Sequence, residues 1–129
     1  MGKVSADIYT DNGPQYLKDN CVKMVICEGE PADYTDANTA KGSGGHKIGE
    51  HTMVTGDFTV TNGDTNGRKV VIAAQNDINI DVAGDADHVA LLSGSVMLMV
   101  TTISPAKTGL AVNDKVNVPE FDDEFADPA

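Results

Sequence analysis

The sequence predicts a mainly β protein: a small single-domain β-sandwich or jelly-roll-like fold of about seven or eight short antiparallel strands, with one short N-terminal helix. Short runs in which apolar and polar residues alternate recur at hairpin-like spacing along the chain. Glycine occurs 13 times and, with many Asp, Asn and Thr residues, favours turns and short strands over long helices. A chain of 129 residues is expected to form one domain, residues 1–129, and to bury a core without disulfides or metal.

The N-terminal part contains one predicted helix, one predicted strand and one predicted loop. Asp11-Asn12-Gly13-Pro14 is typical of a helix start, and residues 15–20 follow as a short helix. Residues 22–27 alternate as a strand. Over residues 28–49 the periodicity disappears and glycines accumulate, which predicts a long loop. Residues 43–47 lack the spacing of a phosphate-binding loop, so we interpret them as a flexible connector.

Residues 68–103 hold most of the apolar side chains that can form a core, and they predict three strands joined by two turns. Ile78, Ile80 and Val82 alternate with polar residues, which is typical of a half-buried strand. Residues 88–92 and 96–102 follow as two strands joined by a glycine-containing turn. Both are apolar on each face, so we expect central strands that are covered on both sides or that pack against a subunit.

The other predicted strands are shorter. Residues 50–55 and 58–61 are predicted strands, and residues 104–109 are a predicted loop. Residues 110–112 and 115–118 frame a turn at Asn113-Asp114. Pro119 is expected to end the last strand because it cannot donate to the ladder, and residues 119–129 then form an acidic C-terminal arm.

The formal charge of −11 and the pI near 4.3 argue against binding to nucleic acid or to an anionic membrane, because both require a cationic face. The acidic residues are not evenly distributed along the chain: residues 120–129 carry five acidic side chains and no basic one. This segment is either a solvated tail or an arm that docks on a basic patch of a partner, anchored by Phe121 and Phe125. The chain has no apolar run of transmembrane length and no signal-peptide pattern at residues 1–11, so we expect it in a cytoplasm or in something assembled there.

One candidate calcium site lies in the stretch between residues 62 and 67. Asn62, Asp64 and Asn66 match the oxygen ligands that open an EF-hand loop. The position that needs a bidentate glutamate is Ala73, so a hairpin turn is the preferred interpretation.

A second candidate cation site combines three carboxylates with a histidine. Asp81, Asp85 and Asp87 precede His88 and can gather at the end of a strand. No second histidine or nucleophile lies nearby in the sequence, so an ordinary surface turn is again the preferred interpretation.

The sequence contains no catalytic motif. The three histidines are scattered, and neither Cys-x-x-Cys nor Gly-x-Ser-x-Gly occurs, so we expect no zinc, no cofactor and no enzyme activity. Cys21 and Cys27 are expected to be reduced and buried, because an extended segment between them holds their sulfurs too far apart to bond. Met97 and Met99 are expected in the core or in a contact between subunits.

Five segments, in their order along the chain, carry a resemblance to a known family. They are YLKDNC leading into VICEGEP (16–31), GRKVVI (67–72), GDADHVAL (84–91), LMVTT (98–102), and VNVPEFD (116–122) with the ending DP. Together they resemble a family of short proteins encoded among the head and tail structural genes of tailed phages and prophages. The similarity extends from about residue 9 to residue 129, and the glycine-rich insertion around residues 42–49 departs from the family pattern.

The resemblance implies a virion structural protein, and the small, acidic, β-rich members of that class are often capsid decoration or cement proteins. It implies a homotrimer bound to a shell of the major capsid protein, in a virion assembled in the host cytoplasm. We expect capsid contacts from the 28–49 loop, including His46 and Lys47, and a trimer seam from the strand block with Met97 and Met99. The C-terminal arm is expected to contribute Phe121, Asp122, Asp123, Glu124 and Phe125. Two alternatives are a tail or head–tail connector component and a calcium-dependent surface-binding module.

Overall fold

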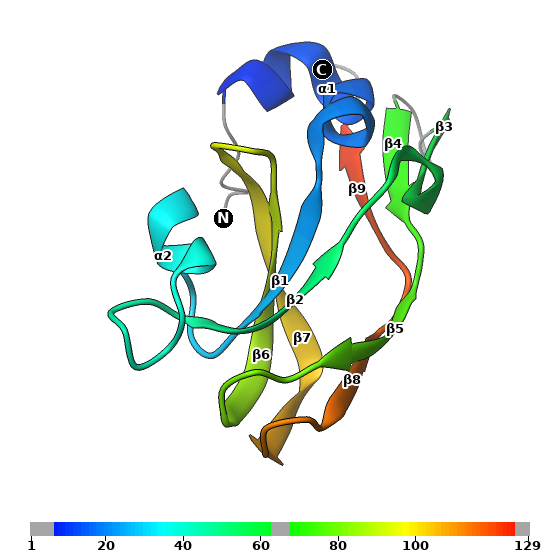
Figure 1. The fold of residues 1–129 in the computed structure, drawn as a ribbon. Helices are drawn as coiled ribbons and strands as arrows, with labels where there is room; N and C mark the ends of the chain where they lie inside the picture. The colour runs from blue at the N-terminus through cyan, green and yellow to red at the C-terminus, as the bar shows by residue number, and fades with distance from the viewer. Residues whose placement is uncertain (1–6, 63–67, 126–129) are drawn as a thin grey trace.

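The structure is a computed structural model that describes residues 7–62 and 68–125. Within these residues, antiparallel strands form two facing layers, which confirms the predicted mainly β, sandwich-like fold (Figure 1). The first layer has the strand order β2-β1-β6-β7. Its strands are β1 (Lys23–Cys27), β2 (Lys47–Thr52), β6 (Gly84–Leu92) and β7 (Met97–Leu110).

The second layer consists of two short sheets with the orders β3-β4-β9 and β5-β8. Its strands are β3 (Phe58–Asn62), β4 (Arg68–Ile72), β5 (Gln75–Asn79), β8 (Lys115–Val118) and β9 (Phe121–Phe125). Ile72 lies opposite Phe121 and Gln75 lies opposite Val118, so the same register continues from one sheet to the other. Pro119 interrupts the ladder between them because it has no N–H to donate. The two sheets therefore form one continuous, bent pair of antiparallel segments, β4–β5 and β8–β9.

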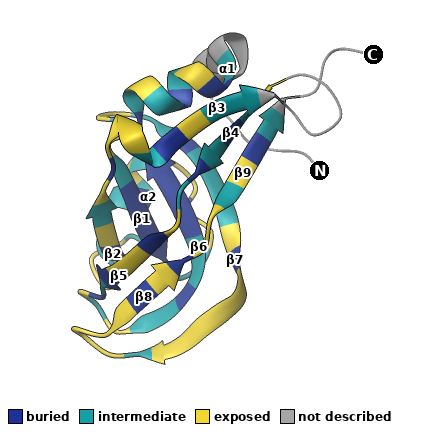
Figure 2. Ribbon diagram, turned by 90° about the vertical axis from the view of Figure 1, so that its right-hand side faces the viewer, coloured by how far each residue is buried: buried dark blue, intermediate teal, exposed yellow. Residues whose placement is uncertain are grey.

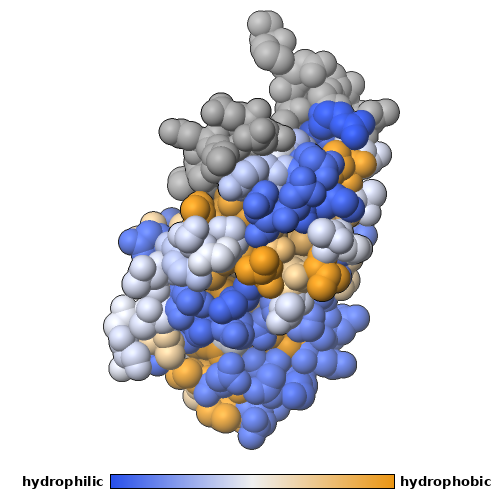
Figure 3. Space-filling view, turned by 45° about the horizontal axis from the view of Figure 1, so that its top comes forward, coloured by the Kyte–Doolittle hydropathy of each residue, from blue (hydrophilic) through white to orange (hydrophobic). Residues whose placement is uncertain are grey.

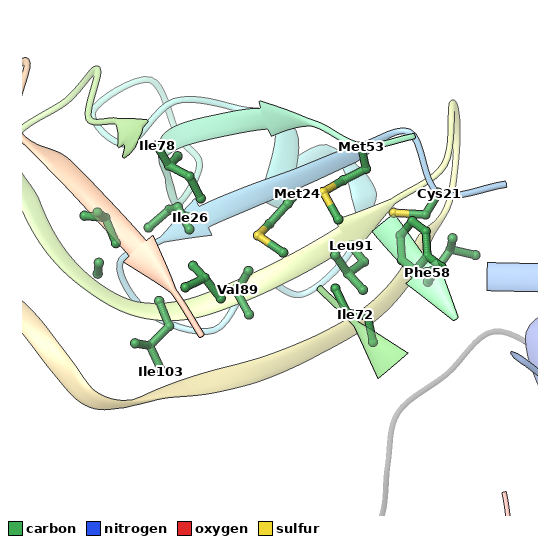
Figure 4. Close-up of a cluster of buried hydrophobic side chains, with 14 of the residues drawn as sticks. Cys21, Met24, Ile26, Met53, Phe58, Ile72, Ile78, Val89, Leu91 and Ile103 are labelled. Carbon is green, nitrogen blue, oxygen red and sulfur yellow. The ribbon is translucent and has the colours of Figure 1, made fainter. Parts of the chain in front are cut away.

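The main core lies between the two layers (Figure 4). Alternation along β6 points Val89 and Leu91 into this core, while Ala90 and Leu92 lie on the opposite face. The side chains that meet Val89 and Leu91 from both layers include Met24, Ile26, Ile72, Ile78, Phe58 and Ile103. The predicted central strand, covered on both faces, is therefore confirmed for β6. It is wrong for residues 96–102, because β7 is the last strand of its sheet and pairs on one side with β6.

A second, smaller cluster lies on the outer face of the first layer. It contains Val25 and Cys27 from β1, Ala90 and Leu92 from β6, and Ala37 from the short helix α2 (Tyr34–Asn38), all fully buried. Helix α2 lies inside residues 28–49. The prediction that these residues form a long loop without secondary structure is therefore wrong. The cause is local, because the carboxylate of Asp33 caps the helix by accepting a hydrogen bond from the N–H of Asp36.

Helix α1 (Asp7–Asn20) closes one end of the sandwich, where it packs against β3, β4 and β9. The predicted helix at residues 15–20 is present, but α1 begins earlier and crosses a kink at Gly13. Gly13 has φ 65°, a conformation that glycine adopts without steric penalty, and Pro14 then opens the second helical segment. Leu17 anchors this segment in the core.

The side of the sandwich next to β2 is closed by contact between the two layers. Gly49 of β2 forms an antiparallel bridge with Ile80, and the N–H of Asp81 donates to the carbonyl of Ile48 at 2.7 Å. Strand β2 begins at Lys47, three residues before the predicted strand at residues 50–55, because Lys47 pairs with Cys27 of β1. A single 3-10 turn, η1 (Thr55–Asp57), connects β2 to β3.

The predicted loop at residues 104–109 is wrong, because β7 continues through it to Leu110. Lys107 pairs with Ala86 and Leu110 with Gly84, and register shifts on both sides of Ala86 accommodate Pro105. A separate strand at residues 110–112 does not form. The predicted turn at Asn113-Asp114 is confirmed, with Asn113 at φ 75°.

The prediction of an acidic C-terminal arm is also wrong for the residues that the structure describes, because residues 121–125 form β9 and pair with β4. Asp123 is only 4% exposed, and the Asp122 carboxylate lies 3.5 Å from the Lys69 ammonium. Arg68 and Lys69 lie opposite the acidic segment, which offsets its charge. Pro119 ends β8 as predicted, but the chain returns to a strand two residues later.

Candidate functional site

The side of the sandwich opposite β2 is open, and a groove of ≈ 190 Å³ lies along it. One wall comes from β7 and the other from the corner where β8 turns into β9. The lining residues are Val89, Thr101, Thr102, Ile103, Ser104, Val118, Pro119 and Phe121. We call this the seam groove.

The lining of the seam groove is neutral. Its lining residues are aliphatic or aromatic, apart from Thr101, Thr102 and Ser104 of β7, which carry hydroxyl groups, and none of the lining residues carries a charge. Pockets for small-molecule ligands usually have volumes of about 300–1,000 Å³, so this groove is small for such a ligand. Its size and chemistry suit one or two apolar side chains from another polypeptide.

Strand β7 borders the groove and is an edge strand, because it pairs with β6 on one side and stands last in the sheet order. Residues 104–109 of β7 are all exposed (Figure 2). No strand within residues 7–62 or 68–125 pairs with its outer edge. An edge with free N–H and C=O groups is a surface to which another strand can add.

A different face of the molecule carries a polar contact between the segment after β1 and strand β6. The Glu28 carboxylate accepts hydrogen bonds from the N–H of Asp85 at 2.8 Å and from the Lys41 ammonium at 3.1 Å. Asp87 accepts a hydrogen bond from the N–H of Gly29 at 2.7 Å. We call this set of contacts the clasp, because it holds the segment that contains α2 against the sheet.

His46 and Asp36 form the second part of the clasp. The Nδ1 atom of His46 lies 2.7 Å from the Asp36 carboxylate, whose other oxygen accepts from the N–H of Ala32 at 2.9 Å. The His46 ring also lies against Gly29, where an added Cβ would come within 3.0 Å of it. Gly29 has φ 83°, so both its conformation and this contact favour glycine.

The clasp lowers the pKa of its three carboxyl groups. Hydrogen bonds from the N–H of Asp85 and from Lys41 hold the pKa of Glu28 below its ordinary value. The N–H of Ala32 does the same for the pKa of Asp36, with His46 adding to it. Burial alone would raise the pKa of Asp87, but hydrogen bonds from His88 and Gly29 outweigh it and lower the pKa. All three groups are therefore held in their charged form.

Both cysteines are free and buried, as predicted. Burial raises the pKa of the Cys21 thiol, and separately that of the Cys27 thiol, to about 12 in each case. The carboxylates of Asp36 and Asp87 contribute to the shift at Cys27, which lies beneath the clasp. At neutral pH neither thiol is a nucleophile.

The candidate calcium ligands do not form a site within the described residues. Asp81 accepts a hydrogen bond from Asn79, and Asp85 accepts one from the N–H of Gly109, so their carboxylates serve local structure. In the part of the chain that the structure describes, no group of three His, Cys, Asp or Glu side chains is placed to hold a metal ion. Asp64 and Asn66 lie outside the described residues, and Asn62 ends β3.

The predicted partner-binding residues are spread over several surfaces rather than gathered on one. His46 belongs to the clasp, and Lys47 pairs with Glu50 at 2.6 Å. Met97 contacts the outer cluster and Met99 the main core, so the two methionines do not form one patch. Phe121 alone lines the seam groove. Asp122, Asp123, Glu124 and Phe125 lie along β9.

Sequence reasoning missed the seam groove. It expected residues 96–102 to be covered on both sides or to pack against a subunit, but it did not identify them as an edge strand. One signal pointed there: residues 88–113 contain no Asp or Glu in a chain with 20 acidic residues. The face in Figure 3 shows small hydrophobic groups separated by hydrophilic side chains.

Comparisons of the chain with protein-family models, with curated proteins and with solved structures gave no match. None of the described helices has the length and apolar character needed to cross a membrane.

Proposed function

We propose that the chain is a structural protein of a tailed-phage virion, and specifically a capsid decoration or cement protein that binds the major capsid protein shell as a homotrimer. The identity of the partner rests on the resemblance of the five sequence segments. The kind of activity rests on one observation: β7 is a long edge strand that borders a neutral, apolar groove. Such a surface suits assembly with another polypeptide.

A cement protein stabilises a shell by burying apolar surface across the boundaries between capsid subunits and by adding strands to sheet edges. Phe121 remains a candidate contact because it lines the seam groove. His46 and the clasp contribute indirectly, since they hold the 28–46 segment in one conformation against β6. The contacts are thus assigned to folded elements instead of a free acidic arm.

The test begins with the native mass of the purified chain, measured by light scattering, followed by sedimentation with undecorated capsids. We expect a trimer that pellets with the shells and saturates at a fixed ratio to the major capsid protein. Shells that already carry the protein are the matched control, and they should bind no more of it. A monomer that stays in the supernatant would rule the proposal out, and binding to isolated tails instead of shells would favour a tail or connector component.

A further inference from the structure

The acid-free stretch of the sequence coincides with one edge of the folded protein. Residues 88–113 contain no carboxylate side chain, and they cover the second half of β6, all of β7 and the start of the next turn. Lys107 is the one formal charge in this stretch apart from His88. Because the chain carries a net charge of −11, a neutral edge of this length stands out from the rest of the surface.

The two halves of β7 differ in how their outer edge is protected. Natural edge strands avoid unwanted pairing through charges, prolines and bulges. The half after Ile103 has all three, with Pro105, Lys107 and the register shifts around Ala86. Residues 97–103, with the sequence MLMVTTI, have no charge, proline or glycine. An unprotected edge of this composition aggregates unless a specific partner covers it.

We infer that the outer edge of β7 at residues 97–103 is the surface on which a second copy of this chain pairs. Two copies that each carry a charge of −11 repel each other least when they meet through surfaces that lack carboxylates. The β7 edge satisfies this condition. A strongly basic partner would gain more from the acidic parts of the surface, so the absence of acid at β7 favours a copy with the same charge.

Three other edges of the described sheets, those of β9, β2 and β3, suit a second copy less well. Strand β9 carries Asp122 and Glu124 along its length, and β2 carries Lys47 and Glu50. Strand β3 is neutral, but Lys18 from α1 donates a hydrogen bond to the carbonyl of Phe58, so α1 occupies part of that edge. A strand added to β7 would extend the first layer and bring apolar side chains to the seam groove.

The decisive variant is Thr102→Glu, which places a charge on an exposed position of the unprotected half of β7. We expect the dissociation constant of the oligomer to be at least tenfold higher in this variant than in the wild-type chain, as measured by light scattering over a dilution series. Thr108→Glu is the matched control, because Thr108 is also exposed on β7 but lies beyond Pro105 and Lys107. It should leave the oligomer intact.

A second measurement covers the case in which Thr102→Glu does not fold. Amide hydrogen exchange of the wild-type chain should slow at residues 97–103 as the protein concentration rises, and should not change at residues 104–110. A dimer would mean that β7 meets β7 of the copy, whereas a closed ring would mean that β7 meets another edge. Either result supports the inference.

A wild-type chain that stays monomeric at ~100 µM would overturn the inference, because ordinary specific association occurs well below that concentration. A Thr102→Glu variant with the oligomer mass and the melting temperature of the wild-type chain would overturn it too. The inference rests on the homo-oligomer of the proposed function and adds the surface through which the copies meet. A monomeric wild-type chain that still binds shells would overturn the β7 pairing but keep capsid binding. An oligomer that pairs through β7 but does not bind shells would support the β7 pairing and overturn capsid binding.

Discussion

The carboxylate of Asp87 accepts a hydrogen bond from the backbone N–H of Gly29 at 2.7 Å, across 58 residues of sequence. The ring nitrogen Nδ1 of His88 lies 2.8 Å from the same oxygen. This contact joins β6 to the start of the segment that carries α2, and α2 contributes Ala37 to the cluster that buries Cys27. The clasp therefore holds in place the segment whose Ala37 packs in the same buried cluster as Cys27.

We expect Asp87→Ala to loosen this segment and to expose the Cys27 thiol. Hydrogen bonds to a charged group contribute about 1.5–3 kcal/mol, and partial exposure of Asp87 reduces this to about 1–2 kcal/mol. The measurement is the rate of thiol labelling under native conditions in a Cys21→Ala background, where Cys27 is the remaining thiol of the two. The rate should rise by about tenfold, since about 1.4 kcal/mol corresponds to that factor. Asp81→Ala, at an exposed carboxylate that contacts Asn79, is the control, and equal rates in the two variants would contradict the role of the clasp.

The stability of the chain should fall as the pH drops below about 4.5. The pKa values of Glu28, Asp36 and Asp87 are lower in the folded chain than their ordinary values of 4.5 for Glu and 3.8 for Asp. The unfolded chain therefore binds more protons in this range, so the stabilisation is complete above the ordinary pKa values and is lost as the pH falls through the lower, folded ones. Urea unfolding at pH 7, 5, 4 and 3 measures the effect.

The matched variant for the pH experiment replaces all three carboxyl groups, as Glu28→Gln, Asp36→Asn and Asp87→Asn together. It should be less stable than the wild-type chain at pH 7 and should lose less stability between pH 5 and pH 3. A parallel fall in both proteins would show that the acid sensitivity comes from carboxyl groups elsewhere in the chain.

Local patterns in the sequence predicted the elements whose partners lie nearby. The alternate burial of Ile78 and Ile80 and the turn at Asn113-Asp114 are both present, because each depends on a few adjacent residues. The strand that contains Ile78, β5, ends at Asn79 and does not reach Val82. Residues 68–103 contribute to four strands, β4 to β7, and not to the predicted three. Free, buried cysteines at positions 21 and 27 also followed from local geometry. Two features of the sequence indicated the site of the further inference: the apolar residues 96–102, expected to be covered or to pack against a subunit, and the absence of acidic residues over 88–113.

The failures involve long-range pairing. Residues 121–125 contain three acidic side chains, which locally predict a solvated tail, but pairing with Arg68 and Lys69 of β4 makes them a strand. Residues 104–109 contain Pro105 and Gly109, which locally predict a loop, but β6 provides a partner and register shifts accommodate them. In both cases tertiary contact outweighed local propensity.

Millimolar calcium should leave the melting temperature of the chain unchanged. Asp85 and Asp87 already accept hydrogen bonds from backbone N–H groups, and a bound cation would have to replace these contacts. Thermal unfolding with calcium and with a chelator tests this, because a ligand that binds only the folded chain raises its stability. A rise that Asp85→Ala abolishes would contradict the assignment of this carboxylate to local structure. A rise that Asp64→Ala abolishes would instead identify calcium binding at residues 62–66.

Deletion of residues 121–129 should destabilise the fold and not merely remove a docking arm. The deletion removes the pairing of β9 with β4 and opens the edge of Val70 and Ile72 to solvent. It also removes Phe121, which is partly buried and packs against the core. Full burial of an aromatic side chain contributes about 1.5–3 kcal/mol, so the partly buried Phe121 contributes less, and the lost strand pairing adds to this. We expect a melting temperature lower by roughly 10 °C or more, from the usual relation of about 4–8 °C per kcal/mol in a small domain. Deletion of residues 126–129 alone is the matched control, because it keeps β9 and should change the melting temperature little. If both truncated chains melt like the full chain, β9 contributes nothing to stability and the acidic segment is the free arm that its composition first indicates.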